Sequence, residues 1–75
     1  MTSLLLGVVT LDNDVFIFEL KMDYGKPFDE VADDALNQID ANGYSERFAV
    51  SGKAMHKIAV VSSSDAKGMV GWKIR

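Results

Sequence analysis

The stretch VFIFELK, residues 15–21, has the pattern of a β-strand with an unusual end. Side chains alternate between two faces along a strand. One face is apolar throughout and carries Phe16, Phe18, Leu20 and Met22. The other face begins apolar and ends charged, with Val15, Ile17, Glu19, Lys21 and Asp23. Burial alone does not require such an end, so we expect this strand to position Glu19 and Lys21 for a site.

The segment before this strand predicts its partner in a β-hairpin. Residues 3–11 (SLLLGVVTL) are apolar or β-branched, and the glycine in their middle suggests a bulge or a close backbone approach. Asp12 and Asn13 suit a two-residue turn. Counting back from that turn gives four expected pairs: Thr10 with Val15, Val8 with Ile17, Leu6 with Glu19, and Leu4 with Lys21. We therefore expect Leu6 to face Glu19.

A helix is expected after the strand, from residue 27 to residue 42. Its apolar side chains recur at helical spacing: Phe28, Val31, Ala32, Ala35, Leu36 and Ile39. Gly43 predicts the end of this helix. Gln38 lies at the margin of the apolar stripe, which predicts a half-buried position against the sheet. Residues 44–48 predict one further helical turn with Tyr44 and Phe48 packed inward.

Two more strands are expected, over residues 55–62 (MHKIAVVS) and 69–74 (MVGWKI), with a polar loop over residues 63–68 between them. The order is then strand, strand, helix, strand, strand. Because a helical crossover joins parallel strands, the sheet should be mixed, with its four strands in chain order and one long helix. This is an α/β (α+β) architecture, ββαββ, in one domain spanning residues 1–75. One helix covers one face, so we expect self-association into a homo-oligomer (a dimer) or a partner chain to cover the other.

Composition narrows the classes of function. The net charge is −3 and the eight lysines and arginines are scattered along the chain, which argues against a free-standing nucleic-acid binder. There is no cysteine, so disulfide and thiolate chemistry are excluded. No apolar run approaches the ~20 residues that span a bilayer, so no membrane insertion is expected. Residues 1–3 lack the basic start of a signal peptide, and we expect a cytoplasmic protein.

The E-x-K pair formed by Glu19 and Lys21 suits metal-assisted hydrolysis. A carboxylate can bind a divalent cation through oxygen. A lysine two residues further on can stabilise developing negative charge or orient a water, as phosphodiester hydrolysis requires. The same alternation also occurs on solvated strand faces. The position of this pair, after Phe-Ile-Phe and before a turn and an amphipathic helix, favours a site.

Four segments carry a resemblance to a known family: FIFELK (16–21), ALNQIDANGYSERF (35–48), KIAVVSSS (57–64) and VGWKI (70–74). From about residue 5 to residue 74 the chain resembles the carboxy-terminal part of the PD-(D/E)xK nuclease superfamily. It most resembles the branch found behind a predicted AAA-type ATPase domain in bacterial proteins. The resemblance implies a restriction-endonuclease-like fold and Mg²⁺-dependent cleavage of nucleic acid. It also implies Glu19 and Lys21 as catalytic residues, Glu19 as the metal ligand, and Gln38 and Tyr44 near the site.

The chain departs from the pattern of that family on its first strand. The family has an aspartate there, after a Gly-Arg-type pair and opposite the glutamate. In this chain Leu6 is expected at that place, and no acid precedes Asp12. The amino-terminal helix and strand of the family core are also absent, so residues 1–75 are expected to be a truncated, partial core.

Three hypotheses follow from the sequence. The first is a nuclease-fold module, catalytically inactive or incomplete, that acts through self-association or a partner. The second is a Mg²⁺-dependent DNA or RNA phosphodiester hydrolase whose site is completed by another chain. The third is a small mixed-sheet domain without a site.

Overall fold

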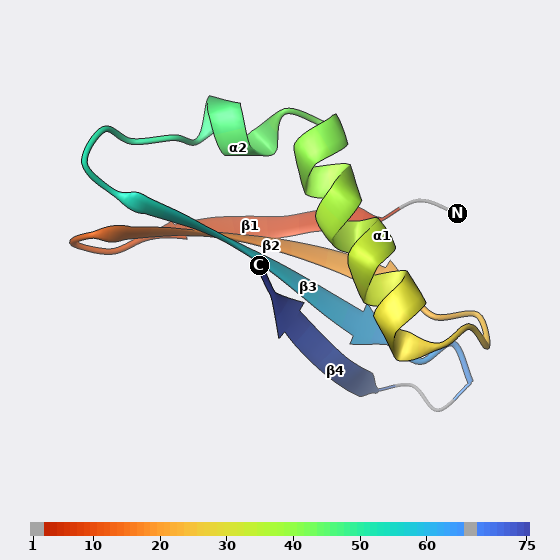
Figure 1. Ribbon diagram of the computed structural model, residues 1–75. Coiled ribbons are helices and arrows are strands. Elements are labelled where there is room, and N and C mark those ends of the chain that lie inside the picture. Colours follow the sequence, from red (N-terminus) through yellow and green to blue (C-terminus); the bar gives the residue numbers. More distant parts are fainter. Residues whose placement is uncertain (1–2, 66–67) are drawn as a thin grey trace.

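The computed structural model describes residues 3–65 and 68–75, which form one four-stranded sheet and two helices (Figure 1). The elements in chain order are β1 (Leu4–Thr10), β2 (Asp14–Met22), α1 (Phe28–Ala41), α2 (Tyr44–Arg47), β3 (Ala54–Ser62) and β4 (Met69–Ile74). The sheet order is β1-β2-β3-β4. β2 and β3 are parallel, and the two outer pairs are antiparallel. The predicted α+β class, strand order and single long helix are confirmed.

The hairpin register is correct near its turn and wrong beyond it. Leu11 donates its backbone N–H to the Asp14 carbonyl oxygen at 2.8 Å, which closes the expected two-residue turn. The expected pairs of Thr10 with Val15 and of Val8 with Ile17 are present. The register then shifts between Leu5 and Gly7, so Leu5 pairs with Glu19 and Leu4 with Leu20.

A β-bulge is the physical reason why the observed register differs from the predicted one. It places one extra residue, Leu6, in β1 without a partner in β2. Gly7 follows that residue, and a Cβ built at Gly7 would meet nothing within 4 Å. Leu6 is therefore not the residue opposite Glu19, and its side chain is 52% exposed.

α1 covers one face of the sheet because its apolar stripe faces the strands. Its buried residues are the predicted Val31, Ala32, Ala35, Leu36 and Ile39. They form the core with Ile17, Ala59 and Val61 of the two central strands. Each large apolar side chain buried in this way contributes about 1.5–3 kcal/mol. Pro27 and Asn42, the expected ends of the helix, are its flanking caps.

α2 is the expected extra helical turn on the same side of the sheet. Gly43 precedes it with a φ of 69°, in the left-handed region that favours glycine. Tyr44 and Phe48 are half-buried, and both pack against the core cluster, as predicted. The two ring centroids lie 6.1 Å apart.

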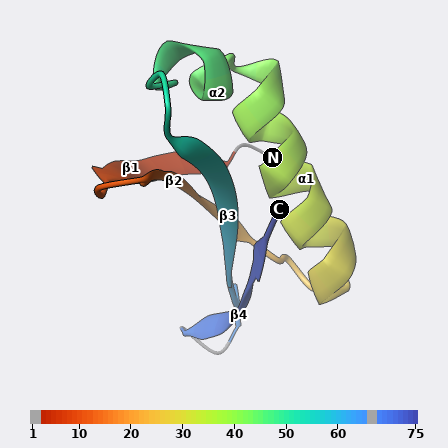
Figure 2. The ribbon, with the colours of Figure 1, turned by 60° about the vertical axis from the view of Figure 1, so that its left-hand side comes forward.

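Among the described residues, no helix lies on the second face of the sheet, as Figure 2 shows from the side. Strand register places eleven large apolar side chains on it: Leu4, Val9, Phe16, Phe18, Leu20, Met22, Ile58, Val60, Met69, Trp72 and Ile74. We call this surface the open face. None of these side chains is buried, whereas Val15, Ile17 and Glu19, which alternate with them along β2, are.

Two expectations concern segments that are partly outside the described residues. The loop expected over residues 63–68 includes residues 66 and 67, and the start of the chain includes residues 1 and 2; these four lie outside the described part. Within the described part, no helix is both long enough and apolar enough to cross a bilayer.

Candidate functional site

Glu19 lies in the interior, on the helix-covered face of β2. Its relative exposure is 1%, and it is the one polar residue among the fully buried side chains of the described residues. Its neighbours in the sheet are Leu5 of β1 and Ala59 of β3. The alternation along β2 that buries Val15 and Ile17 also buries Glu19. The strand therefore fixes this carboxylate between two apolar neighbours, beneath α1.

The two oxygens of Glu19 are in different situations. Oε2 accepts a hydrogen bond from the Ser3 hydroxyl, which lies just before β1. Oε1 is buried and has no hydrogen-bond partner among the described residues. A buried carboxylate oxygen without a donor is costly, because the interior does not replace the hydration that the group loses. Among the described residues, the fold therefore supplies a hydrogen-bond donor to one oxygen of Glu19 and none to the other.

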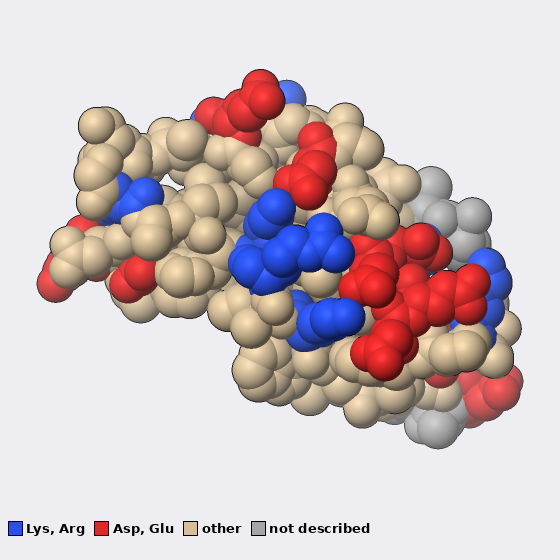
Figure 3. All heavy atoms as spheres, in the orientation of Figure 1, with Lys and Arg blue, Asp and Glu red and all other residues tan. Residues whose placement is uncertain are grey.

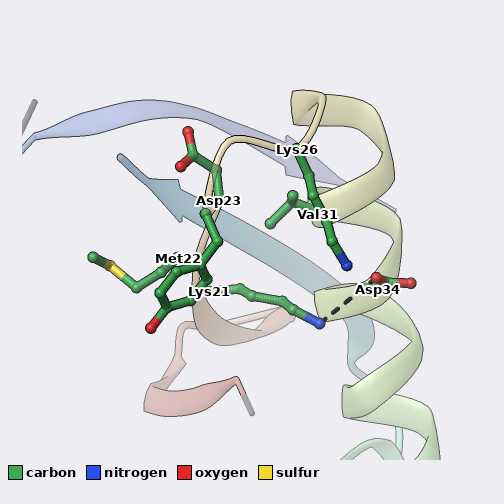
Figure 4. Close-up of a pocket in the computed structure, with 7 residues that line it drawn as sticks. Lys21, Met22, Asp23, Lys26, Val31 and Asp34 are labelled. Carbon is green, nitrogen blue, oxygen red and sulfur yellow. Dashed lines mark ion pairs between the residues drawn. The ribbon is translucent and has the colours of Figure 1, made fainter. Parts of the chain in front are cut away.

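Lys21 lies on the same face of β2, two residues nearer its end, and is bound to α1. Its Nζ is 3.6 Å from Oδ2 of Asp34, and its side chain is 12% exposed (Figure 4). The pair lies at a pocket of about 280 Å³ between the end of β2 and the first turns of α1. The pocket is lined by Lys21, Met22, Asp23, Tyr24, Lys26, Val31 and Asp34. The carboxylate nearest to the lysine of the E-x-K pair thus comes from the helix.

Asp23 clamps the loop after β2 and does not join Glu19. Its Oδ1 accepts hydrogen bonds from the Gly25 N–H (3.1 Å) and the Ser64 N–H (3.2 Å), and from the Ser64 hydroxyl (3.3 Å). The Gly25 N–H, and after it the Ser64 N–H, lower the pKa of the Asp23 carboxyl below its ordinary value of 3.8. Figure 4 shows this carboxylate pointing away from the Lys21–Asp34 pair. Asp23 therefore ties the β2–α1 loop to the β3–β4 loop.

The two remaining predicted site residues lie elsewhere on the helices. Gln38 is exposed, not half-buried as expected, because its position on α1 turns it away from the stripe that Ala35 and Ile39 bury. Tyr44 is half-buried against the core. Among the described residues, neither side chain makes a hydrogen bond to Glu19 or Lys21. Their predicted role in a site stays a prediction.

Sequence reasoning missed the two residues that contact the E-x-K pair. Ser3 lies sixteen positions before Glu19, and no local pattern in the sequence indicates their contact. Asp34 gave a usable signal: it lies three residues after the buried Val31, so it shares that flank of the helix.

The donor set does not fit a hydrated metal ion in this conformation. Mg²⁺ keeps several of its waters when it binds to a protein. The Glu19 carboxylate is almost inaccessible, its Oε2 is occupied by Ser3, and its nearest neighbour on β1 is a leucine. No group of three His, Cys, Asp or Glu side chains within residues 3–65 and 68–75 is arranged to bind a metal. Binding at Glu19 would require Ser3 or α1 to move, and a ligand from elsewhere.

Ion pairs dominate the surface on the α1 side, where basic and acidic side chains lie side by side (Figure 3). Asp40 binds Lys57 at 2.8 Å, and Asp33 binds Lys73 at 2.8 Å and Arg75 at 3.7 Å. Their hydrogen bonds to Lys73 and Lys57 lower the pKa of Asp33 and of Asp40, respectively. The cations from the sheet are thus neutralised by carboxylates from the helix.

The fold and the E-x-K strand together define a small α+β domain with a glutamate and a lysine fixed on one face of a central strand. The family model of the PD-(D/E)XK nuclease superfamily matches residues 4–72. The chain therefore belongs to the PD-(D/E)XK nuclease superfamily. The searches of curated proteins and of solved structures give no match. Members of this superfamily generally use divalent metal ions.

Proposed function

We propose that this chain is a nuclease-fold module that does not hydrolyse phosphodiesters by itself and that acts by binding another polypeptide. The observation that carries the proposal is the pairing of Glu19 with Leu5 in the β1–β2 register. The place where a second carboxylate could face Glu19 holds an aliphatic side chain. The hydroxyl of Ser3 occupies one oxygen of the glutamate, so Glu19 lacks both an acidic neighbour on β1 and access to solvent.

The open face supports the binding part of the proposal. Contiguous apolar patches larger than a few hundred Å² are rare on soluble monomers and mark interaction sites. On this sheet, eleven large apolar side chains lie on the face that α1 does not cover. The partner is either a second copy of the chain or a different protein.

A cleavage assay on the purified chain tests the catalytic part. We expect no cleavage of plasmid, single-stranded DNA or RNA in millimolar Mg²⁺ or Mn²⁺ above the level of the Glu19→Ala variant, which provides the background. Cleavage by the unmodified chain that is abolished in Glu19→Ala would contradict the proposal. The same preparation should show no shift in thermal stability on addition of either metal.

The second candidate is a metal-dependent phosphodiester hydrolase whose site is completed by another chain. The unpartnered Oε1 of Glu19 favours it, because a ligand or a donor group from outside would satisfy that atom. Addition of a candidate partner, for example an AAA-type ATPase chain encoded nearby, separates the two functions. Metal-dependent cleavage that appears only in the mixture and disappears in Glu19→Ala would favour the hydrolase. The link to such an ATPase stays a prediction.

A further inference from the structure

The open face is uniform in chemistry. Its side chains come from all four strands and are aliphatic or aromatic. Leu4, which is 62% exposed, and Trp72, which is 58% exposed, lie on its opposite edge strands. Charge enters only at one end, where His56 Nε2 and Asp14 Oδ1 lie 2.7 Å apart and the imidazole stacks on Phe16. Covering such a surface with another apolar surface is favourable, and exposed patches of this size mark interaction sites.

Four cations of the molecule lie on the other side of the sheet. Lys21, Lys57, Lys73 and Arg75 each lie within 4.0 Å of a carboxylate of α1. Strand register places the three sheet lysines on the helix-covered face, opposite the open face. Apart from the end that carries Asp14 and His56, the open face therefore offers no charged side chain to phosphate groups or to a charged protein patch. The surface that complements it must be uncharged and apolar, and the open face itself is such a surface.

The dimensions of the sheet fit a small interface. Its strands are six to nine residues long. At about 3.3 Å per residue and about 4.8 Å between strands, one face covers on the order of 500 Å². Two sheets that pack about 10 Å apart interdigitate their inner side chains. Such a pair would cover on the order of 1,000 Å² in total, just below the roughly 1,200–2,000 Å² that stable interfaces bury and within the size of weak, transient ones.

We propose that the partner of the open face is a second copy of this chain, packed sheet to sheet about a two-fold axis. This inference rests on the proposed function, since it names the polypeptide that the module binds. A two-fold axis brings the same patch of both copies together, so an uncharged face is complementary to itself without any charge matching. Because the interface is smaller than those of stable complexes, the dimer dissociates on dilution.

The single tryptophan of the chain provides the measurement, because Trp72 lies on the open face. We expect its fluorescence emission to shift to shorter wavelength as the protein concentration rises. Sedimentation velocity over the same concentrations should show the mass doubling in parallel. Both changes report burial of the same surface, one locally and one globally.

Two charged substitutions and a matched control locate the interface. Val9→Lys and Ile74→Lys each place a cation on the open face at an exposed position, on opposite edge strands, so the monomer should keep its fold. Each is expected to weaken self-association at least tenfold. Val50→Lys changes an equally exposed apolar residue outside the strands and should leave association unchanged. Far-ultraviolet circular dichroism confirms that each variant is folded.

Two outcomes would overturn the inference. One is a folded monomer with solvent-exposed Trp72 emission at every concentration up to the millimolar range. The other is a dimer that both open-face variants leave intact. Either result leaves the absence of hydrolysis standing, because the cleavage assay tests that separately. Conversely, cleavage by the purified chain would overturn the proposed function whether or not the chain dimerises.

Discussion

At the scale of single residues, the buried Glu19 is the feature that the fold alone does not explain. A buried carboxylate with one unpartnered oxygen costs stability, and proteins keep such groups where function or specificity requires them. We predict that Glu19→Gln is at least as stable as the unmodified chain, because the amide keeps an acceptor for Ser3 and removes the charge. Glu19→Ala should lose about 1–3 kcal/mol, through the cavity and the unpaired Ser3 hydroxyl. Urea denaturation measures both.

The opposite order of stabilities would be informative. If Glu19→Gln were strongly destabilised, the carboxylate would have to be compensated by a cation or donor in solution, and the hydrolase hypothesis would gain. Ser3→Ala is the control. It leaves Glu19 in place but without its one donor, so it should also lower stability.

The corrected register leads to a second prediction at the same scale. Leu5→Asp should create measurable affinity for Mn²⁺ or Mg²⁺, because it places a second carboxylate beside Glu19 on the same face of the sheet. The substitution also removes apolar contact with the core, so a less stable apo protein that is stabilised by metal is expected. Isothermal calorimetry and thermal unfolding with and without metal measure the two effects.

Leu6→Asp is the matched control for that experiment. It introduces the same charge one residue further along β1, at the bulge, where the side chain is exposed. It should add no metal affinity and should change stability little. Equal affinity in the two variants would show that a general rise in negative charge, and not the Leu5–Glu19 pairing, binds the metal.

At the scale of elements, the helix was predictable and the hairpin only in part. The apolar spacing in α1 fixed its buried residues and its ends to within one position, because helical periodicity repeats over many residues. The β1–β2 register was correct as far as Val8, where it depends only on the turn. It failed beyond that point, because a bulge adds one residue without changing the apolar pattern of LLLG. Gly7 indicated the position of the bulge, but not the direction in which the register shifts.

The loop clamp built on Asp23 predicts how stability depends on pH. The pKa of this carboxyl is lowered in the folded chain, so the ionised form contributes stability that is fully present above the ordinary pKa of 3.8. That contribution is lost as the pH falls below 3.8 and through the lowered folded pKa. Asp23→Asn should therefore be less stable than the unmodified chain at neutral pH, and the difference should shrink toward pH 3. Thermal unfolding at several pH values measures it.

Asp65→Asn serves as the comparison for that pH series. Asp65 is exposed on the same β3–β4 connection, and its carboxylate makes no ion pair with another described residue. Its replacement should leave the pH profile of the unmodified chain unchanged. A constant difference between Asp23→Asn and the unmodified chain across the acid range would contradict the clamp.

At the scale of the whole molecule, the sequence predicted the bare face of the sheet but not the arrangement of charge. The central strand is apolar on both sides, and one helix can cover only one face of the sheet. The open face is the consequence. The lysines and arginines are scattered along the sequence, so the sequence alone does not predict that some of them form a cluster. Folding brings Lys57, Lys73 and Arg75 together opposite α1, since strands distant in sequence become neighbours in a sheet.

This neutralised cluster provides the last prediction, which concerns affinity for nucleic acid. Asp33→Asn with Asp40→Asn should free Lys57, Lys73 and Arg75 and raise the net charge by two, from −3 to −1. We expect the double variant, unlike the unmodified chain, to bind single-stranded DNA at micromolar concentration. With three phosphate contacts, the logarithm of its affinity should fall against the logarithm of salt concentration with a slope of about −2.

Asp12→Asn with Glu46→Gln makes the same change in charge at exposed positions away from the cluster and should gain no affinity. Fluorescence anisotropy of labelled DNA compares the three proteins; an equal gain in both variants would mean that net charge alone, and not the pairing with α1, keeps nucleic acid away.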